Sequence, residues 1–389
     1  MYFHIHQPYR LKPLGVFDVG VGGDYFDVDE GLDFSNKRVI GKIADKSYLP
    51  MLSLLLDLLN KESSFCFALS ITGTVIEQIK EYSPEVFGLL KKVVATGRVE
   101  IVSETYYHSL ASLFSPTEFL FQVSKHKRLI EDEFGVVPSI FRNTELIYTN
   151  KIARMVGDMG FKGMLAEGAD KILKGRSPTR LYKSPDGLPL LLKHYKLSDD
   201  IAFRFSQFHK SDKPLTADTY SHWISSSFDQ GEVVNLFMDF ETFGEHQWAD
   251  TGIFDFFRHF VGKFIETGNS FVSLGSAIES RRADDVFDSE EPVSWADVDR
   301  DITAWKGNAL QDDVLDKIYE LEGEILSSGD ERMIEDWRRM QTSDHFYYMC
   351  TKWSNDGDVH AYFSPYGSPF MAYCNYNNAL ADLRLRVNN

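Results

Sequence analysis

Apolar and polar positions alternate in blocks along the first two thirds of the chain. Short β-prone apolar runs are separated by amphipathic stretches of roughly ten to twenty residues, the pattern of strands joined by helices. The predicted strands cover residues 2–6, 65–71, 99–103, 139–143, 163–167, 190–195, 233–240 and, as one more short strand, 271–274. This alternation predicts an α/β fold, with a parallel sheet and crossover helices.

Helix signals fall between these runs. The predicted helices cover residues 49–60, 83–97, 115–134 and 150–159. Ser83-Pro84 and Ser115-Pro116 each place a capping serine before a proline suited to the first helical turn. Residues 10–47 are rich in Gly and Asp and predict a long irregular insertion.

Polar side chains stand at the ends of five predicted strands. They are His6, Glu104, Glu145, Glu167 and Asp239. In a closed βα barrel the carboxyl ends of the strands meet at one mouth, where active sites form. A doubly wound open sheet would also collect these side chains along one edge, so the pattern predicts α/β without deciding closure.

The character of the chain changes after about residue 285. Residues 284–292 are acidic and linker-like, and residues 312–340 show apolar positions at helical spacing among dense charge. We therefore expect two domains: an α/β domain over 1–285, with the insertion at about 10–47, and a mainly helical domain over 286–389.

Composition limits the classes of partner and the compartment. A net charge of −17 repels phosphates and anionic lipid, so neither nucleic acid nor a membrane surface is expected as a partner. The three cysteines, Cys66, Cys350 and Cys374, form no CxxC pair, which favours a reducing compartment. With no leader pattern and no apolar run of membrane-spanning length, we expect a soluble cytoplasmic protein.

Residues 235–248 form the densest candidate for chemistry. An apolar run delivers Asp239, Glu241, Glu245 and His246, framed by aromatic residues that include Trp248. Most charge clusters are solvated surface, and that interpretation stays open here. The aromatic frame favours function, because apolar surroundings raise the pKa of a carboxyl group that must act as a general acid.

A second candidate is the segment 141–145, Phe-Arg-Asn-Thr-Glu. A strand again ends in a carboxylate, and Arg142 could keep Glu145 ionised, as a nucleophile requires. An ordinary strand-end salt bridge explains the same residues. His4 and His6 lie on one face of the first strand, where they could bind a metal, bond sugar hydroxyls or satisfy buried neighbours.

Aromatic and amide side chains cluster again near residue 300. The block contains Trp295, Asp297, Trp305, Asn308 and Gln311. Indole faces stack on sugar C–H surfaces, while Asn, Asp and Gln bond hydroxyl groups. For any single tryptophan, a buried structural role is the commoner explanation.

The order of these segments resembles glycoside hydrolase family 57, the second α-amylase family. The resemblance rests on His-Gln-Pro at 6–8, Gly-Arg-Val-Glu-Ile at 97–101, Arg-Asn-Thr-Glu at 142–145, Asp-Phe-Glu-Thr-Phe-Gly-Glu-His at 239–246 and Ala-Trp-Lys-Gly-Asn at 304–308. Residues 342–349 are similar to those of α-amylase-like members. The matches span essentially the whole chain, and the 239–246 signature is the specific one. The family usually has an aromatic residue before the glutamate, so residues 141–143 depart from that version, which bears on substrate preference.

The resemblance implies an incomplete (β/α)7 barrel followed by a helical bundle. It also implies a retaining enzyme that acts on α-1,4-glucans or maltooligosaccharides without a metal or other cofactor. Glu145 would be the nucleophile and Asp239 the acid/base. The residues expected to contact substrate are His4, His6, Glu104, Glu241, His246, Trp248, Trp305, Asn308 and Asp344.

Three alternatives remain at this stage. A 4-α-glucanotransferase or a branching enzyme would use the same two carboxylates but pass the glycosyl unit to another sugar. A metal-dependent polysaccharide deacetylase on a similar barrel would use His4, His6 and an aspartate. A non-catalytic glucan-binding protein would not need both carboxylates, which makes intact Glu145 and Asp239 an argument against it.

Overall fold

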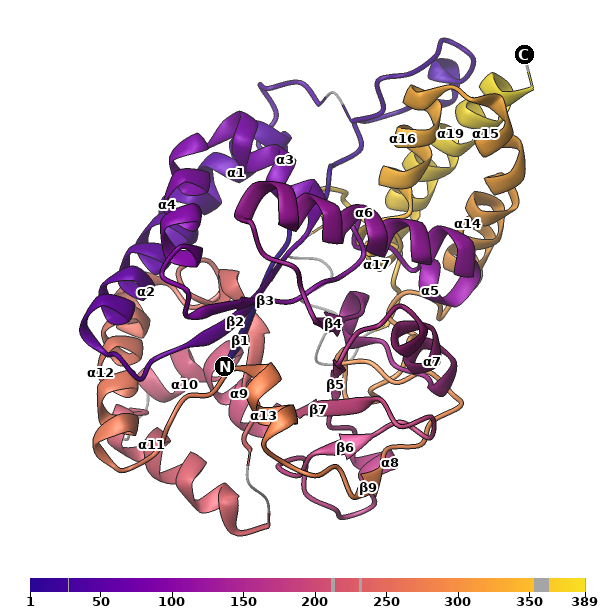
Figure 1. The fold of residues 1–389 in the computed structure, drawn as a ribbon. Coiled ribbons are helices and arrows are strands. Elements are labelled where there is room, and N and C mark those ends of the chain that lie inside the picture. The colour runs from indigo at the N-terminus through magenta and orange to yellow at the C-terminus, as the bar shows by residue number, and fades with distance from the viewer. Residues whose placement is uncertain (27, 211–213, 231–232, 353–363, 389) are drawn as a thin grey trace.

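Parallel β-strands form the centre of the protein (Figure 1). The computed structural model describes residues 1–388 apart from 27, 211–213, 231–232 and 353–363, so parts of the predicted insertion and of the predicted C-terminal domain lie outside the described residues. The strands are β1 (Tyr2–Ile5), β2 (Phe67–Ile71), β3 (Val99–Ile101), β4 (Ile140–Arg142), β5 (Gly163–Glu167), β6 (Tyr182–Lys183), β7 (Pro189–Lys193), β8 (Phe237–Asp239) and β9 (Asp285–Val286).

Two single-residue bridges close the strands into a barrel. One sheet has the order β3-β2-β1-β8, and the other begins β4-β5-β7 before the short β6 and β9. Ser103 pairs with Phe141 between β3 and β4, and Lys193 pairs with Asn235 between β7 and β8, both parallel. The described strands therefore form a closed parallel ring in the order β8-β1-β2-β3-β4-β5-β7, one strand short of the eight of a complete βα barrel.

An apolar layer fills the inside of this ring. Each strand, or the residue just after it, contributes one inward side chain: Tyr2, Ala68, Val102, Ile140, Leu165, Leu191 and Phe237. Strands that are buried on both faces carry continuous apolar runs, as all-buried β1 and β2 do. The barrel is thus a packed core rather than a pore.

Helices cover the outside of the ring. Those associated with the barrel are α1 (Asn36–Ile43), α2 (Leu49–Lys61), α3 (Gly73–Tyr82), α4 (Pro84–Val94), α5 (Ala111–Phe114), α6 (Pro116–Phe134), α7 (Asn150–Asp158), α8 (Asp170–Leu173), α9 (Tyr195–Ala202), α10 (Phe205–His209), α11 (Ala217–Ser226), α12 (Ile253–Glu266) and α13 (Leu274–Glu279). The predicted helices correspond to α2, α4, α6 and α7. Ser115 caps α6 as expected, because its side chain accepts a hydrogen bond from the Glu118 amide.

The strand predicted at residues 271–274 is wrong. Leu274 instead begins α13, which Ser273 caps, and Leu274 and Ala277 pack against the apolar layer inside the barrel. The Glu100 carboxylate accepts hydrogen bonds from the amides of Leu274 and Gly275. Helix α13 therefore packs against one end of the apolar layer and plugs the barrel there, and residues 271–273 before it pair with no strand.

The segment 10–47 is less irregular than predicted. It contains α1, followed by a π-helical segment at Ala44–Tyr48 that leads directly into α2. Ile40 and Ile43 give α1 a buried face, and Ser35 caps its first turn. Apolar residues at helical spacing explain this helix, although Gly and Asp dominate the residues before it.

The C-terminal part is mainly helical, as predicted. Its helices are α14 (Ala309–Glu320), α15 (Glu322–Ser328), α16 (Glu331–Met340), α17 (Ser343–Tyr347) and α19 (Pro369–Val387). Figure 1 shows α14, α15, α16 and α19 together at one side of the barrel. Their apolar faces share one buried cluster with residues of α6, α7 and β4. Among the described residues, no helix is both long and apolar enough to span a bilayer.

Candidate active site

Charged side chains form a layer directly above the apolar layer of the barrel. Two residues beyond each inward apolar position stand His4, Ser70, Glu104, Arg142, Glu167, Lys193 and Asp239. Side chains alternate between the two faces of a strand, so a step of two residues keeps the same inward direction. Along each strand, the inward side chains therefore change from the apolar core to the polar and charged site over two residues.

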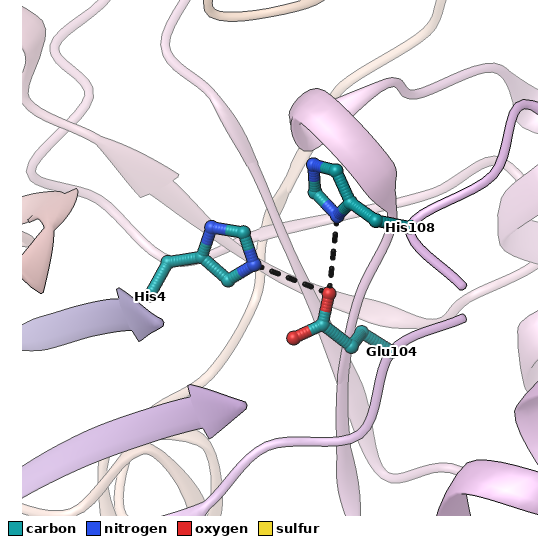
Figure 2. Close-up of side chains that lie close together, drawn as sticks. All are labelled: His4, Glu104 and His108. Carbon is teal, nitrogen blue, oxygen red and sulfur yellow. Dashed lines mark hydrogen bonds and ion pairs between the residues drawn. The ribbon is translucent and has the colours of Figure 1, made fainter. Parts of the chain in front are cut away.

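An unbroken set of polar contacts runs from Asp239 to Glu145 across this layer. His4 joins Asp239 Oδ1 through Nδ1 (3.4 Å) and Glu104 Oε2 through Nε2 (3.2 Å). His108 Nδ1 lies 3.3 Å from the same Glu104 oxygen, and its Nε2 lies 3.2 Å from Glu145 Oε1. Figure 2 shows the middle of this arrangement, with both rings directed at one oxygen of Glu104.

Glu145 is held by donors on both carboxylate oxygens. The Trp295 indole donates to Oε2 at 2.7 Å, and the Ser343 hydroxyl donates to Oε1 at 3.0 Å, beside His108. Burial alone would raise the pKa of Glu145, but the hydrogen bond and charge of His108, with the charge of Arg142, lower it. Glu145 also has φ of 56°, a left-handed conformation that non-glycine residues rarely adopt. The carboxylate is therefore ionised and fixed in direction.

His108 supplies the positive charge that the sequence suggested Arg142 would supply. Burial opposes its protonation, yet the hydrogen bonds that its ring donates to Glu104 and Glu145 outweigh it and raise the pKa of His108 to about 9. Arg142 is fully buried and lies nearer Glu104, with Nη1 3.8 Å from Oε2. Its role at Glu145 is that of a more distant charge.

Trp295 lies between two cations of the charged layer. Its ring centroid is 5.0 Å from the Arg142 guanidinium carbon and 5.3 Å from Lys193 Nζ. The Arg300 guanidinium donates to the Trp295 carbonyl oxygen. Cation–π attraction to both groups and the hydrogen bond to its carbonyl oxygen therefore hold Trp295 in the position from which its indole donates to Glu145.

Asp239 is the more open of the two proposed catalytic carboxylates. Its side chain is 39% exposed, against 16% for Glu145. Burial would raise the pKa of Asp239, but the hydrogen bond and charge of His4, with the charge of His246, lower it. Next to it, Glu241 is buried and accepts from the Tyr48 hydroxyl at 2.5 Å. Burial and the charge of Asp239 raise the pKa of Glu241 to about 8, so Glu241 is protonated at neutral pH.

His6 and Asp344 meet beside His108. His6 Nε2 lies 3.0 Å from Asp344 Oδ2, and its Nδ1 contacts the Thr72 hydroxyl at 2.9 Å. The His6 and His108 ring centroids are 4.1 Å apart. Ser343 and Asp344 are the first two residues of α17, so this helix brings both from the C-terminal part of the chain to the barrel mouth.

The remainder of the 239–246 signature forms the wall of the site. Glu245 is buried and pairs with Lys42 Nζ at 2.5 Å and with Lys46 Nζ at 3.4 Å. His246 is partly buried, and burial lowers the pKa of its ring. Trp248 is 56% exposed, and Lys46 Nζ lies 5.5 Å from its ring centroid. An exposed indole near the site leaves an aromatic face accessible to a ligand.

Two residues expected to contact substrate have structural positions instead. Trp305 is 2% exposed, belongs to the apolar cluster beneath α14 and α19, and packs near Tyr347. Asn308 caps α14: its side chain accepts from the amides of Leu310 and Gln311 and donates to the Met349 carbonyl. The Ala-Trp-Lys-Gly-Asn segment thus packs the core and starts a helix.

His108, Ser343 and Tyr48 contact the proposed site residues but do not stand out in the sequence. His108 follows a tyrosine-rich turn, and its only sequence signal is the spacing of four from Glu104. Trp295 belongs to the aromatic block near residue 300, but the chain does not reveal that Glu145 is its partner. Their proximity arises only when distant segments meet at the barrel mouth.

Within the part of the chain that the structure describes, two sets of side chains have the composition of metal ligands. They are His4 with Glu104 and His108, and His6 with His108 and Asp344; within each set the ligand atoms lie within 4.8 Å of one another. Arg142 Nη1 lies 3.4 Å from His108 Nδ1 and 3.8 Å from Glu104 Oε2. A fixed guanidinium beside the first set repels a cation there. In the second set, every histidine contact is also explained by a hydrogen bond.

The fold and the site together define an α/β-barrel enzyme with a carboxylate-rich active site at the barrel mouth. The chain matches "Glycosyl hydrolase family 57" over residues 1–289. It is 40% identical to the "Putative alpha-amylase" of Methanocaldococcus jannaschii, an alignment that covers 99% of this chain and 84% of that protein. The protein belongs to glycosyl hydrolase family 57. The resemblance drawn from the sequence is confirmed.

Solved structures share the fold. A branching enzyme from Thermococcus kodakaraensis superimposes with a TM-score of 0.66 at 14% identity, covering 91% of this chain and 86% of that chain. A 4-alpha-glucanotransferase from Thermococcus litoralis gives a TM-score of 0.64 at 14% identity, covering 89% and 55%. The predicted fold class, an incomplete (β/α)7 barrel followed by helices, is confirmed.

Proposed function

We propose that the protein is a retaining α-amylase-type hydrolase of α-1,4-glucans, with Glu145 as nucleophile and Asp239 as acid/base. Glu145 attacks the anomeric carbon while Asp239 gives its proton to the departing glycosidic oxygen. Asp239 then takes a proton from water, whose oxygen attacks the anomeric carbon and so releases the sugar from Glu145. The observation that carries the proposal is that both carboxylates belong to one hydrogen-bonded set of side chains at the barrel mouth.

The surroundings of Glu145 suit a nucleophile. His108, Ser343 and Trp295 fix both oxygens, and the charge of His108 favours the ionised form. A nucleophile of this kind must be ionised before substrate binds and must be held toward the anomeric carbon. The left-handed backbone at residue 145 supports a functional interpretation, since such conformations persist mainly where the surrounding structure holds them.

The exposure of Asp239 suits an acid/base. In the free protein the neighbouring His4 and His246 favour its ionised form. A bound glucan would cover the exposed part of the side chain, and the loss of water would favour the protonated form needed for the first step. Glu241 is protonated beside it and so adds no second negative charge there.

Hydrolysis is proposed over glycosyl transfer because of the relative at 40% identity, which carries an α-amylase name. The structural neighbours named as a branching enzyme and a 4-alpha-glucanotransferase are only 14% identical and share the fold. A transferase would use the same two carboxylates with a sugar hydroxyl as acceptor. Incubation with maltooligosaccharides distinguishes them: hydrolysis gives only shorter products, whereas transfer also gives longer or branched ones.

Single substitutions of the two carboxylates test the mechanism. Glu145→Gln and Asp239→Asn should each lower kcat by about 10³-fold or more, since each removes a group that forms or breaks a bond. Glu118→Gln, at a buried glutamate on α6, and Asp250→Asn, at an exposed aspartate, are the matched controls and should retain activity. Near-normal turnover by either active-site variant would overturn the assignment.

The stereochemistry and the metal requirement complete the test. The α-anomer should appear first in the proton NMR spectrum of fresh products, and the two carboxyl groups should lie ~5–5.5 Å apart in a substrate complex. First appearance of the β-anomer would contradict double displacement. Dialysis against a chelator should leave turnover unchanged; loss of activity, restored by a divalent cation, would instead favour the metal-dependent deacetylase class.

A further inference from the structure

His4, Glu104 and His108 are buried between the two proposed catalytic carboxylates. Each imidazole uses both ring nitrogens toward carboxylate oxygens, His4 toward Asp239 and Glu104, and His108 toward Glu104 and Glu145. A histidine ring donates from both nitrogens only when it is protonated on both. One oxygen, Glu104 Oε2, is shared by the two rings (Figure 2).

The charges of this cluster balance when both rings are protonated. Three carboxylates, Glu104, Glu145 and Asp239, then face two imidazolium groups and the Arg142 guanidinium. Glu104 and Arg142 are fully buried, and both histidines are nearly so. In such a low-dielectric interior, a change of charge at one end is poorly screened at the other.

Double displacement moves one negative charge between the two ends of this cluster. In the first step the bond from Glu145 to the anomeric carbon forms, the glycosidic bond breaks and the leaving oxygen takes the proton of Asp239. The charge leaves Glu145 and appears on Asp239. In the second step the oxygen of a water molecule forms a bond to the anomeric carbon while Asp239 takes its proton, the bond to Glu145 breaks, and the negative charge returns to Glu145.

We propose that His4, Glu104 and His108 are positioning residues that couple the charge on Glu145 to that on Asp239. The coupling acts through the shared Glu104 oxygen. When Glu145 becomes an uncharged ester, His108 loses one anionic acceptor and interacts more strongly with Glu104 Oε2. His4 is then less neutralised by Glu104 and stabilises the ionised form of Asp239, which is the base that the second step requires. This inference rests on the proposed function for its role in turnover.

Other titratable and charged groups also face the cluster. They are Tyr2 and His6 on or just after β1, His126 on α6, Arg142 on β4, Glu241 and His246 after β8 and Asp344 on α17. Arg142 also lies within 3.4 Å of His108 Nδ1. All of these groups stay unchanged in the variants compared below, so their fields cancel from the comparison.

Histidine NMR of the full chain tests the coupling without requiring turnover. The chain has 11 histidines, and ¹⁵N-labelled ring signals of His4 and His108 can be assigned with His4→Gln and His108→Gln variants. Glu145→Gln removes the charge of the nucleophile while keeping its shape, as the glycosyl ester does. We expect the protonation midpoint of His108 to fall by about one pH unit or more, and the His4 ring signals to shift although another ring lies between His4 and Glu145.

Substitution of Glu104 shows whether the shared oxygen carries the effect. In a Glu104→Gln background, the response of His4 to Glu145→Gln should be lost. Glu118→Gln is the matched control, because Glu118 is equally buried but pairs with Arg338 on α16. That background should leave the His4 response intact. An unchanged His4 response in Glu104→Gln, or no response with Glu104 present, would overturn the coupling.

A reciprocal measurement avoids dependence on the folding of the Glu104 variant. Asp239→Asn should shift the ring signals of His108, because contacts through His4 and Glu104 link residue 239 to that ring, and an unmoved His108 spectrum would refute the inference. The two hypotheses fail separately. Coupled spectra with full activity of Glu145→Gln would refute the proposed function alone, whereas inactive variants with uncoupled spectra would refute only the coupling.

Discussion

Glu167 belongs to the charged layer of the barrel but not to the contacts that join Glu145 and Asp239. It is fully buried, and the cations that face it, Lys193 Nζ at 3.8 Å and Arg300 Nη1 at 4.0 Å, lie beyond hydrogen-bond distance. Burial outweighs these two charges and raises the pKa of Glu167 to about 7. The folded protein therefore holds a proton here that the unfolded chain releases at lower pH.

This proton makes a specific prediction about stability. Between pH 4.5, the unperturbed value, and about 7, the folded state binds more protons at Glu167 than the unfolded state, so stability falls as pH rises through that window. Glu167→Gln should remove this part of the pH dependence, about 1–3 kcal/mol across the window. Urea unfolding of both proteins at pH 4.5 and 7.5 measures it. Equal pH dependence in the two proteins would contradict a raised pKa at Glu167.

At the residue scale, strand-end carboxylates were predictable and their partners were not. Glu104, Glu145 and Asp239 follow apolar runs, and the geometry of parallel strands brings such positions together. His108 and Ser343 lie in a turn and at the start of a short helix, 37 and 198 residues from the Glu145 that they contact. No local pattern encodes contacts over such separations. The helix cap at Asn308 is a local contact, which sequence can reveal. It was missed because Asn308 lies in a family signature and was therefore expected to contact substrate.

The loop after β8 depends on a glycine for its approach to the segment before α2. Gly244 has φ of 107°, and a β-carbon there would collide with the backbone carbonyl of Lys46. In the same loop, Glu241 accepts a hydrogen bond from Tyr48 and Glu245 pairs with Lys46. Both partners belong to the π-helical segment Ala44–Tyr48. The glycine therefore lets two elements approach closely and places Glu241 beside Asp239.

Gly244→Ala should lower both stability and activity. The left-handed conformation and the backbone collision together should cost roughly 2–4 kcal/mol of unfolding free energy. Gly252→Ala is a matched control, since Gly252 has φ of 78° but open space around its β-carbon position. We expect it to cost about 1 kcal/mol, the conformational part alone. Similar losses in the two variants, measured by thermal unfolding, would show that the close approach to Lys46 is unimportant.

At the element scale, strands and helices with their own sequence signals were predicted well. Strand β5 and helices α6 and α7 follow apolar periodicity and capping residues closely. Residues 271–274 show the limit of that reasoning: a short apolar run does not reveal whether it pairs with a strand or plugs a barrel end. Helix α1 shows another limit, because its apolar face is only a few residues long in a segment dominated by turn formers.

Closure of the whole barrel could not be predicted from the alternation of apolar and polar positions, because it depends on two isolated residue pairs. Ser103 with Phe141 and Lys193 with Asn235 join two sheets that otherwise have free edges. Both pairs lie at least partly outside the regular strands, where periodicity gives no signal. At this scale the pattern predicted the α/β class and a separate helical character toward the C-terminus, and the family resemblance alone implied the incomplete barrel.

The apolar layer should account for much of the stability of the barrel. Leu165 is fully buried in it, two residues before Glu167. Leu165→Ala should lower the free energy of unfolding by about 2–5 kcal/mol, the cost of a lost side chain and the cavity that remains. Leu120→Ala, on the exposed face of α6, makes the same chemical change and should cost less than about 1 kcal/mol. Comparable losses in denaturant unfolding would contradict a tightly packed barrel interior.

The two-residue step between the apolar and charged layers limits where the chain tolerates changes in length. Deleting or adding one residue within β1 or β8 would turn His4 or Asp239 outward toward the helices and bring an apolar neighbour to the barrel axis. Length changes in loops beyond the charged layer reverse no side chain. Insertions and deletions should therefore accumulate above the charged layer among relatives of this chain, while the strand segments below it keep a constant residue count.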